Sequence, residues 1–328
     1  MPTATPVEGA PHSLALIGAG PWGRNYVRTF DDFPGARLSV VCSRNPETAG
    51  LVSKGTRIEP DWRRGLAEPG LDGIIIAAPP AAHAVMMDAA FDLGLPVMVE
   101  KPMVLDLSEA ERLHARATAE AIPVVVDHVH LFQPGYAALK ELSRDLGPVR
   151  AICSRGGSLG PFRRPTPALW DWGPHDVALC LDLKGETPAH LEATVREGAG
   201  TNGQRGEVFE IEMTFEDGVR ARIETGNGFE GRERRLEAVT DFATLVLDDN
   251  AEHQLVRRDT ASGAETPVPV SPERPLARAV AAFAAAIRGE AAEHTGTALG
   301  LDVVRVLAAC DAQISAADRA GVRGRHVV

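Results

Sequence analysis

Short runs of consecutive apolar residues alternate with longer amphipathic segments over the first 130 residues of the chain. The runs cover residues 14–17, 38–41, 73–77, 97–99 and 124–126. Uninterrupted apolar strands separated by helices are typical of a parallel sheet covered on both faces, because each strand is then buried on both sides. The pattern therefore predicts a doubly wound α/β domain over residues 13–130, preceded by a flexible tail of residues 1–12.

From about residue 131 the chain changes to strands in which apolar and polar positions alternate, mostly between residues 191 and 256. The segments 207–215 and 219–224 flank a Glu-Asp-Gly turn and predict a hairpin. The polar, Gly-rich segment 198–206 is interpreted as a loop. Helices are expected at residues 134–143, 174–183, 276–287 and 301–317. Residues 131–328 therefore form a predicted second domain, an antiparallel sheet with helices on one side.

Three local signals give finer expectations. Ser108 followed by Glu111 has the spacing of a capping box at a helix start. Pro174 suits the first position of a helix, which would place His175 in the first turn. The charged run 232–235 is interpreted as an exposed strand edge.

Composition narrows the class of protein. The 34 basic and 45 acidic side chains give a net charge of -11, opposite in sign to that of proteins that bind nucleic-acid phosphates. No apolar stretch reaches the roughly 18 to 20 residues that a membrane span needs. The widely spaced Cys42, Cys153, Cys180 and Cys310 predict buried thiols in a reducing compartment. We therefore expect a cytoplasmic protein that binds neither nucleic acid nor membrane.

The first apolar run leads directly into Gly18-Ala-Gly20-Pro-Trp-Gly23, a G-x-G-x-x-G motif that opens a helix. Gly18 permits the tight turn, Gly20 lets a pyrophosphate approach the backbone, and Gly23 allows close packing of the helix. The helix N-terminus favours the anion. The motif indicates a dinucleotide-binding site, with a purely structural glycine turn as the alternative.

The second strand ends at Ser43-Arg44, where an NAD site usually offers a carboxylate to the ribose 2′-hydroxyl. An arginine at this position accommodates a 2′-phosphate instead. The pair therefore favours NADP over NAD as cofactor. A surface arginine beside an NAD site is the alternative.

Two further segments carry chemistry. Glu100-Lys101 follows the apolar run 97–99, and ligands bind beyond the carboxyl ends of parallel strands. Asp171 precedes His175 by four residues, and the dipole of a helix that begins at Pro174 would keep the imidazole neutral and able to accept a proton. The alternatives are a solvated Lys101, a helix-capping Asp171 and an interior His175.

Taken together, these motifs resemble the glucose-fructose oxidoreductase, inositol dehydrogenase and rhizopine catabolism (Gfo/Idh/MocA) family. The order of the Gly18 motif, residues 77–83, Glu100-Lys101-Pro102 and Asp171-x-x-x-His175 carries the resemblance over nearly the whole chain. It implies an N-terminal Rossmann domain, a C-terminal α+β domain with an open-faced sheet often used for oligomerisation, and catalytic roles for Lys101, Asp171 and His175. The candidate cofactor-binding residues are Gly18, Gly20, Pro21, Trp22, Gly23, Ser43, Arg44, Ala78, Pro79, His83, Glu100 and Lys101.

Within the family, residues 155–163 and 169–176 look like the branch that oxidises nucleotide-linked amino sugars at the 3-hydroxyl. Ser43 and Gly156-Gly157 depart from that branch, in regions expected to face ligands, so cofactor and substrate stay open. The candidate substrate-binding residues are Lys101, His128, Arg155, Arg163, Trp170, Asp171 and His175. His128 and His130 would share a strand face. A zinc site needs further ligands at suitable spacing, and the sequence offers none, so no metal site is predicted.

The expected function is hydride transfer between a nicotinamide and a carbinol carbon of a sugar, cyclitol or nucleotide sugar, by a homo-oligomer, a dimer or tetramer. Lys101 and His175 can exchange the roles of hydrogen-bond donor and general acid/base. Two alternatives are a glycoside hydrolase that uses NAD catalytically and a sensor that keeps the dinucleotide fold without catalysis.

Overall fold

A computed structural model describes residues 11–162, 165–292 and 294–319. The chain divides into two compact units, Met1–Val129 with Arg274–Leu301, and His130–Glu273 with Asp302–Val328. Most of the tail predicted for residues 1–12 lies outside the described residues, and the first strand begins at His12.

The first unit contains a six-stranded parallel sheet with the order β3-β2-β1-β4-β5-β6. The strands are β1 (His12–Ile17), β2 (Ala36–Cys42), β3 (Arg57–Glu59), β4 (Gly73–Ile76), β5 (Val97–Glu100) and β6 (Val124–Asp127). Every residue of β4, β5 and β6 is buried, as expected for strands covered on both faces. The predicted doubly wound α/β fold is confirmed, and the short edge strand β3 is an addition to it.

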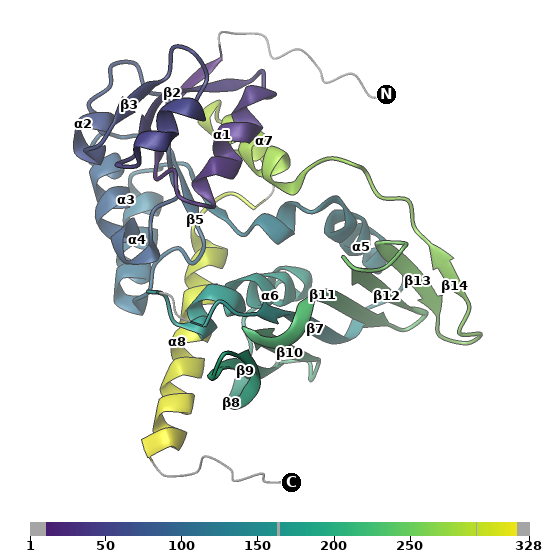
Figure 1. The fold of residues 1–328 in the computed structure, drawn as a ribbon. Coiled ribbons are helices and arrows are strands. Elements are labelled where there is room, and N and C mark those ends of the chain that lie inside the picture. Colours follow the sequence, from purple (N-terminus) through teal and green to yellow (C-terminus); the bar gives the residue numbers. More distant parts are fainter. Residues whose placement is uncertain (1–10, 163–164, 293, 320–328) are drawn as a thin grey trace. The chain divides into compact units, whose positions relative to one another are not determined.

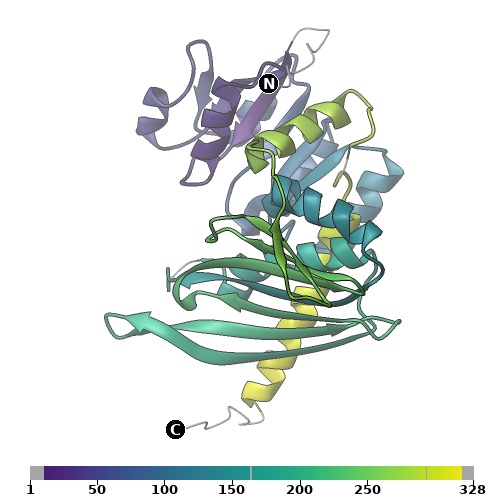
Figure 2. The same cartoon turned by 90° about the vertical axis from the view of Figure 1, so that its right-hand side faces the viewer.

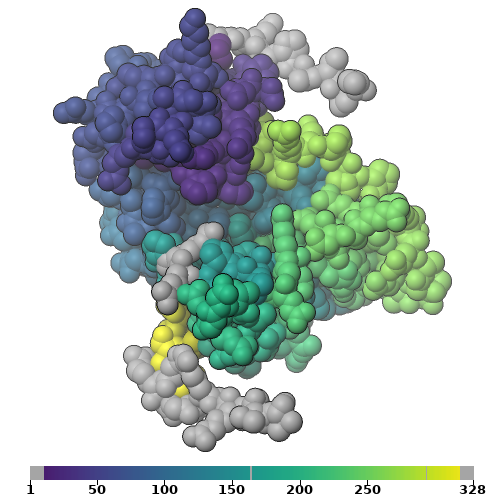
Figure 3. Space-filling model, viewed as in Figure 1, coloured from purple at the N-terminus to yellow at the C-terminus, as the bar shows by residue number. Residues whose placement is uncertain are grey.

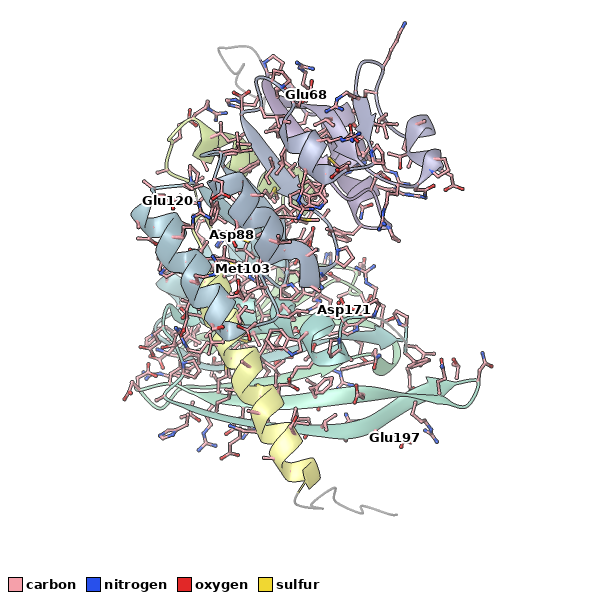
Figure 4. All side chains as sticks on the ribbon, turned by 90° about the vertical axis from the view of Figure 1, so that its left-hand side faces the viewer. Glu68, Asp88, Met103, Glu120, Asp171 and Glu197 are labelled. Atoms are coloured by element: carbon pink, nitrogen blue, oxygen red, sulfur yellow. The ribbon has the colours of Figure 1, made fainter. Side chains whose placement is uncertain are left out.

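Helices cover the first sheet on both sides. In Figures 1 and 2, α1 (Gly23–Asp31) and α7 (Pro275–Ile287) lie on one side of the strands, and α3 (His83–Phe91) and α4 (Leu107–Ala119) lie on the other. A short helix, α2 (Trp62–Leu66), contacts β1 and β2. Asp88 of α3 joins α4 through Arg112 and Arg116, and Asp88 is labelled in Figure 4.

Helix α7 belongs to the first unit, although the sequence interpretation assigned residues 131–328 as a whole to the second domain. Its Phe283 is fully buried, and a Cβ atom added to Gly73 of β4 would lie only 3.0 Å from the Phe283 ring. The apolar face of this helix therefore completes the core of the first sheet from a distant part of the chain.

The capping box expected at Ser108 is wrong. Helix α4 begins at Leu107, and the carboxylate of Asp106 accepts the first free backbone hydrogen bond, from Glu109 N at 3.0 Å. Ser108 instead donates its hydroxyl to Asp106 Oδ1. Aspartate is as effective an N-cap as serine, so Asp106 caps this helix two residues before the predicted position.

The second unit contains an eight-stranded sheet with the order β14-β13-β12-β11-β7-β10-β9-β8. The strands are β7 (Val149–Leu159), β8 (His190–Thr201), β9 (Gln204–Thr214), β10 (Arg220–Gly226), β11 (Gly228–Thr240), β12 (Ala243–Asp248), β13 (Leu255–Asp259) and β14 (Glu265–Pro267). Among these described strands, β7 and β10 pair in parallel and the other neighbours pair antiparallel. Helices α5 (Pro134–Asp145) and α6 (Ala168–Lys184) pack on one face of this sheet (Figure 2). The predicted α+β fold, with a mostly antiparallel sheet, is confirmed.

The loop predicted for residues 198–206 is in fact a hairpin. Strand β8 continues to Thr201 and β9 begins at Gln204, so that only Asn202 and Gly203, both with positive φ, form the turn. Cβ atoms added at Gly198 or Gly206 would approach the backbone of Gly228 within 2.4 to 2.7 Å. These glycines therefore allow neighbouring strands to come close together, which the sequence interpretation took for loop composition.

Helix α8 (Ala298–Arg319) protects the edge strand of the second sheet. The side-chain amide of Gln313 accepts a hydrogen bond from Ala193 N and donates one to Leu191 O of β8, at 2.9 Å each. It thereby pairs backbone groups that an edge strand leaves open. None of the described helices is long and apolar enough to cross a membrane.

The face of the second sheet opposite α6 carries mostly charged side chains. They line a hollow of about 540 Å³ and include Arg155, Arg222, Arg235, Glu192, Glu210, Glu212, Glu224 and Glu237. Cys153 lies exposed among them, contrary to the prediction that all the cysteines are buried. Cys42, Cys180 and Cys310 are buried as predicted.

The face of the second sheet that α6 covers holds a buried ion pair between this helix and β11. Asp176 accepts hydrogen bonds from Arg234 (2.8 Å), Ser154 (2.7 Å) and Thr225 (2.9 Å), and both charged residues are buried. A Cβ atom at Gly156 would lie 2.4 Å from Arg234. The run 232–235 is therefore not an exposed edge: β11 is an inner strand, and Arg234 turns inward to neutralise Asp176.

We expect Arg234→Met to lower the free energy of unfolding by about 3–5 kcal/mol, because it leaves the Asp176 charge buried without its partner. Urea unfolding followed by circular dichroism measures the effect. The matched control is Arg258→Met, which removes the exposed pair with Glu265 and is expected to cost less than about 1 kcal/mol. Equal losses in the two variants would contradict the importance of the buried pair.

Candidate functional site

The turn between β1 and α1 is built by backbone contacts that only glycine permits. Gly18 has a φ of +101°, and a Cβ atom there would lie 2.6 Å from Ala77 O at the end of β4. A Cβ atom at Gly23 would lie 2.0 Å from Gly18 O. Around Gly20, in contrast, a Cβ atom would meet nothing within 4 Å. The first and last glycines therefore close the turn, and the middle one leaves open space beside the backbone.

This turn lies at the surface of the first unit, where the N-terminal elements are purple in Figure 3. Gly20, Pro21 and Trp22 are exposed, Trp22 to 43%. Next to them, Arg24 of α1 has a buried Nε atom with no hydrogen-bond partner among the described residues. An open backbone turn at a helix N-terminus, beside a guanidinium with an unused donor, fits the diphosphate of a dinucleotide.

At the end of β2, Ser43 and Arg44 differ in their surroundings. Ser43 Oγ accepts hydrogen bonds from Asn45 N and Thr48 Oγ1, which hold the start of the 3-10 helix Pro46–Gly50. Arg44 is exposed and forms no ion pair within the described ranges. Glu47 of the same short helix accepts a hydrogen bond from Arg24 at 3.2 Å. Two arginines thus flank the end of β2, and the one carboxylate between residues 43 and 50 already has a partner.

His83, at the start of α3, is fully buried. Its Nδ1 lies 3.1 Å from Pro102 O and 3.2 Å from Met103 O, and its Nε2 lies 2.8 Å from Ala78 O. Burial lowers the pKa of this imidazole, against the backbone carbonyls that raise it. The ring therefore ties the Ala78-Pro79 segment to the segment that follows Lys101.

The ends of β5 and β6 carry a buried acidic pair. Glu100 and Asp127 are register partners in the sheet, and burial is the main cause that raises the pKa of both carboxyl groups. Tyr26 of α1 lies within hydrogen-bond distance of both. The ammonium group of Lys101 acts in the opposite direction and lowers the pKa of each carboxyl.

His128 follows Asp127 and does not share a strand face with His130, because β6 ends at Asp127 and a 3-10 helix (Val129–Phe132) begins. Burial, with the nearby Lys101 charge, lowers the pKa of His128 to about 3. Neither ring nitrogen has a hydrogen-bond partner among the described residues, and the same holds for Asp127 Oδ1. Buried polar atoms of this kind are expected to find a partner, so they fit a polar ligand at the end of β6.

In the second unit, Asp171 and His175 lie on α6, and Asp171 is labelled in Figure 4. Their spacing of four residues places them on the same side of the helix. The ring of His130 meets that of His175 edge-on, with 4.7 Å between the centroids and 81° between the planes. Trp170, which directly precedes Asp171, is buried, with 5% of its surface exposed.

The predicted start of this helix at Pro174 is wrong. Helix α6 begins at Ala168, Asp171 N already donates to Pro167 O, and Pro174 lies inside the helix. His175 is therefore not in the first turn, and the dipole argument for a neutral imidazole no longer applies. The helix includes the buried Leu169 and Trp170 on the N-terminal side of Pro174. It therefore lacks the one backbone hydrogen bond that the proline nitrogen cannot donate.

The structure separates Arg155 from the other candidates of its unit. Arg155 lies on the face of the sheet opposite α6, where it forms ion pairs with Glu224 and Glu233. Arg163 lies outside the described residues. The unusual Gly156-Gly157 pair leaves space for Arg234 and for the Phe229 ring, so packing within the second unit accounts for it.

The sequence analysis gave no site role to three residues near the first sheet: Arg24, Tyr26 and Asp127. Asp127 directly follows an apolar run, and the rule that drew attention to Lys101 applies to it equally. Arg24 and Tyr26 lie close behind the last glycine of the turn, but nothing in the sequence shows which strand ends they reach. Among the described residues, no group of three or more His, Cys, Asp or Glu side chains is arranged to hold a metal ion.

The fold and these residues define a two-unit protein with a dinucleotide-type turn, and comparison with known proteins identifies the class. Residues 13–128 match the model of the oxidoreductase family with an NAD-binding Rossmann fold (Gfo/Idh/MocA). A crystal structure of a protein from Magnetospirillum magnetotacticum MS-1, described as an oxidoreductase, is 41% identical and covers 92% of this chain and 99% of its own, with a TM-score of 0.83. The chain belongs to the Gfo/Idh/MocA family.

Two relatives with assigned activities are more distant. An inositol 2-dehydrogenase from Streptomyces avermitilis is 34% identical over 136 residues, which are 39% of this chain and only 39% of that enzyme. The UDP-N-acetylglucosamine 3-dehydrogenase of Acidithiobacillus ferrooxidans is 24% identical over 73% of this chain and 75% of its own. Its crystal structure shares the fold, with a TM-score of 0.80 over 93% of this chain and 98% of that one, at 20% identity.

The two kinds of glycine in the turn lead to a testable contrast. We expect Gly20→Ala to leave the unfolding midpoint unchanged and to weaken dinucleotide binding about tenfold, because its Cβ atom occupies only the open space beside the backbone. Gly23→Ala is expected to lower the unfolding midpoint, since its Cβ atom meets Gly18 O. Thermal unfolding and NADH or NADPH fluorescence titration measure the two effects. A destabilised Gly20→Ala protein that binds normally would contradict this division of roles.

Proposed function

We propose that this protein is an NAD(P)-dependent oxidoreductase that transfers a hydride between nicotinamide and a CH–OH carbon of a sugar, cyclitol or nucleotide sugar. One observation carries the proposal. The glycine turn directly follows the carboxyl end of β1, Lys101 directly follows the carboxyl end of β5, and both strands belong to one parallel sheet. In such sheets these ends form the ligand-binding edge. The inositol and nucleotide-sugar dehydrogenases among the relatives support this substrate class.

The bound nicotinamide supplies the hydride chemistry, and the chain supplies binding and proton transfer. Gly20 and Arg24 hold the diphosphate at the start of α1. Lys101 donates a hydrogen bond to the reacting oxygen and stabilises its negative charge. His175 takes or returns the hydroxyl proton, a role suited to imidazole, which titrates near neutral pH. Asp171, one helical turn away, orients His175.

The preferred cofactor in this proposal is NADP. Ser43 stands where an NAD site usually has a carboxylate that accepts a hydrogen bond from the ribose 2′-hydroxyl. The exposed Arg44 beside it is available to bind a 2′-phosphate. Glu47, the carboxylate nearest in sequence to Arg44, is already paired with Arg24. Arg44 is therefore the positive charge that this proposal offers to an anionic 2′-phosphate.

We expect Arg44→Ala to weaken NADPH binding by about tenfold to a hundredfold, the loss of one hydrogen bond between charged groups. NADH binding is expected to stay within about twofold of wild type. Fluorescence titration of purified protein with each nucleotide measures both constants. Arg37→Ala is the matched control, since Arg37 is exposed near the start of β2, whereas Arg44 follows the end of that strand. Tighter binding of NADH than of NADPH by the wild type would overturn the NADP preference.

Substitution of the proposed catalytic side chains should separate chemistry from binding. We expect Lys101→Met and His175→Ala to keep cofactor affinity and to lose turnover by about a hundredfold or more, the usual size of an acid/base contribution. Production of reduced nicotinamide is measured against a panel of inositols, aldoses and nucleotide sugars. The exposed Lys54→Met and His253→Ala serve as controls with normal turnover.

Wild-type rates in Lys101→Met or His175→Ala would remove that residue from the mechanism. Release of a sugar product without net reduced nicotinamide would instead favour a glycoside hydrolase that uses the dinucleotide catalytically. Tight dinucleotide binding without turnover of any substrate in the panel would favour a sensor.

A further inference from the structure

Three side chains from three elements meet in the interior of the first unit, next to the proposed cofactor edge. Tyr26 of α1 places its hydroxyl 2.9 Å from Glu100 Oε1 and 2.5 Å from Asp127 Oδ2. Tyr26 and Asp127 are fully buried, and Glu100 is 8% exposed. A dinucleotide-binding turn does not require any of these contacts, and the proposed chemistry uses none of the three side chains.

The cluster has links on both sides. The indole Nε1 of Trp22, in the exposed part of the glycine turn, donates a hydrogen bond to Glu100 Oε1. The backbone N of Lys101 donates to Glu100 Oε2 at 3.3 Å. One carboxyl group therefore connects the turn that faces the dinucleotide with the residue proposed to contact the substrate.

The number of protons in the cluster follows from its chemistry. The Tyr26 hydroxyl has a single hydrogen, yet its oxygen lies within hydrogen-bond distance of both carboxyl groups. The contact that this hydrogen does not serve therefore requires a proton on the carboxyl group itself. Two adjacent buried carboxylates do not both ionise, because each charge disfavours the other and burial disfavours both. Burial also raises the pKa of the Tyr26 hydroxyl, so Tyr26 stays a donor. The cluster then carries one shared proton and one negative charge, next to the positive charge of Lys101.

We propose that Tyr26, Glu100 and Asp127 are positioning residues that share one proton and fix the Lys101 segment relative to the dinucleotide-binding turn. The kinetic consequence of this inference rests on the proposed function, whereas the shared proton does not. A hydroxyl bonded to both acids holds α1 against the ends of β5 and β6. Without it, Glu100 can rotate, and the Lys101 backbone and the Trp22 indole lose their common partner.

The first test detects the proton itself and needs neither cofactor nor substrate. We expect the infrared spectrum of the wild-type protein at pH 7 to contain a carbonyl band of a protonated carboxylic acid that is absent from Glu100→Gln. In Tyr26→Phe this band is expected to persist at a shifted frequency, because its carboxyl group has lost a hydrogen-bond partner. If the wild-type spectrum contains no carboxylic acid band that Glu100→Gln or Asp127→Asn changes, the shared proton is ruled out.

The second test measures positioning. The chain contains only two tyrosines, and the other, Tyr136, is also fully buried and also bonded to an aspartate, Asp182, at 2.6 Å. We expect Tyr26→Phe to lower kcat about tenfold with a dinucleotide Kd within about twofold of wild type, while Tyr136→Phe leaves both unchanged. Comparison of the unfolding midpoints of the two variants corrects for general loss of stability.

Equal kcat values in the two tyrosine variants would overturn the positioning role and leave the proposed function intact. If the wild-type protein itself turns over no substrate, the proposed function fails instead. The infrared test then still decides whether the cluster holds its proton.

Discussion

All six strands of the first sheet run in one direction, so their carboxyl ends lie along a single edge. This constraint brings together segments that are far apart in the chain: the glycine turn after β1, Ser43-Arg44 after β2, Pro79 after β4 and Lys101 after β5. Each connection must also leave the sheet at once, which is why Gly18 and Gly23 cannot carry a side chain. The chemistry of the edge follows from which residues end each strand.

The same geometry forces polar groups into the interior. Glu100 and Asp127 end adjacent strands and lie side by side, with helix α1 packed on the same side of the sheet. In the second unit Asp176 enters the interior from α6 and meets Arg234 from β11. The two solutions differ: the first pair of groups is compensated by a shared proton and a tyrosine, and the second by an opposite charge. Burial makes either arrangement costly to disturb, since a lost partner leaves a polar group without water.

The sequence was sufficient for the features that depend on local patterns. Continuous apolar runs predicted the parallel sheet, alternation predicted the second sheet, and Glu216-Asp217-Gly218 predicted its hairpin correctly. Local patterns failed where packing competes with them. Pro174 signals a helix start, but buried Leu169 and Trp170 extend α6 before it. Gly198 and Gly206 signal a loop, but they serve close contact between strands. For Arg155, whose role stays a prediction, strand alternation sets the side chain on the charged face opposite α6.

The contacts that sequence reasoning missed altogether join residues that are distant along the chain. Tyr26 and Asp127 are 101 positions apart, and Asp176 and Arg234 are 58 apart. No periodicity or motif links such residues, because their contact depends on how helices settle on a sheet after it has formed. Their positions nevertheless obey a simple rule. Each acid lies beside a residue that the motifs single out, Glu100 next to Lys101 and Asp176 next to His175. A buried, fully bonded neighbour fixes the backbone from which a reactive side chain extends, and precise placement of that side chain depends on such support.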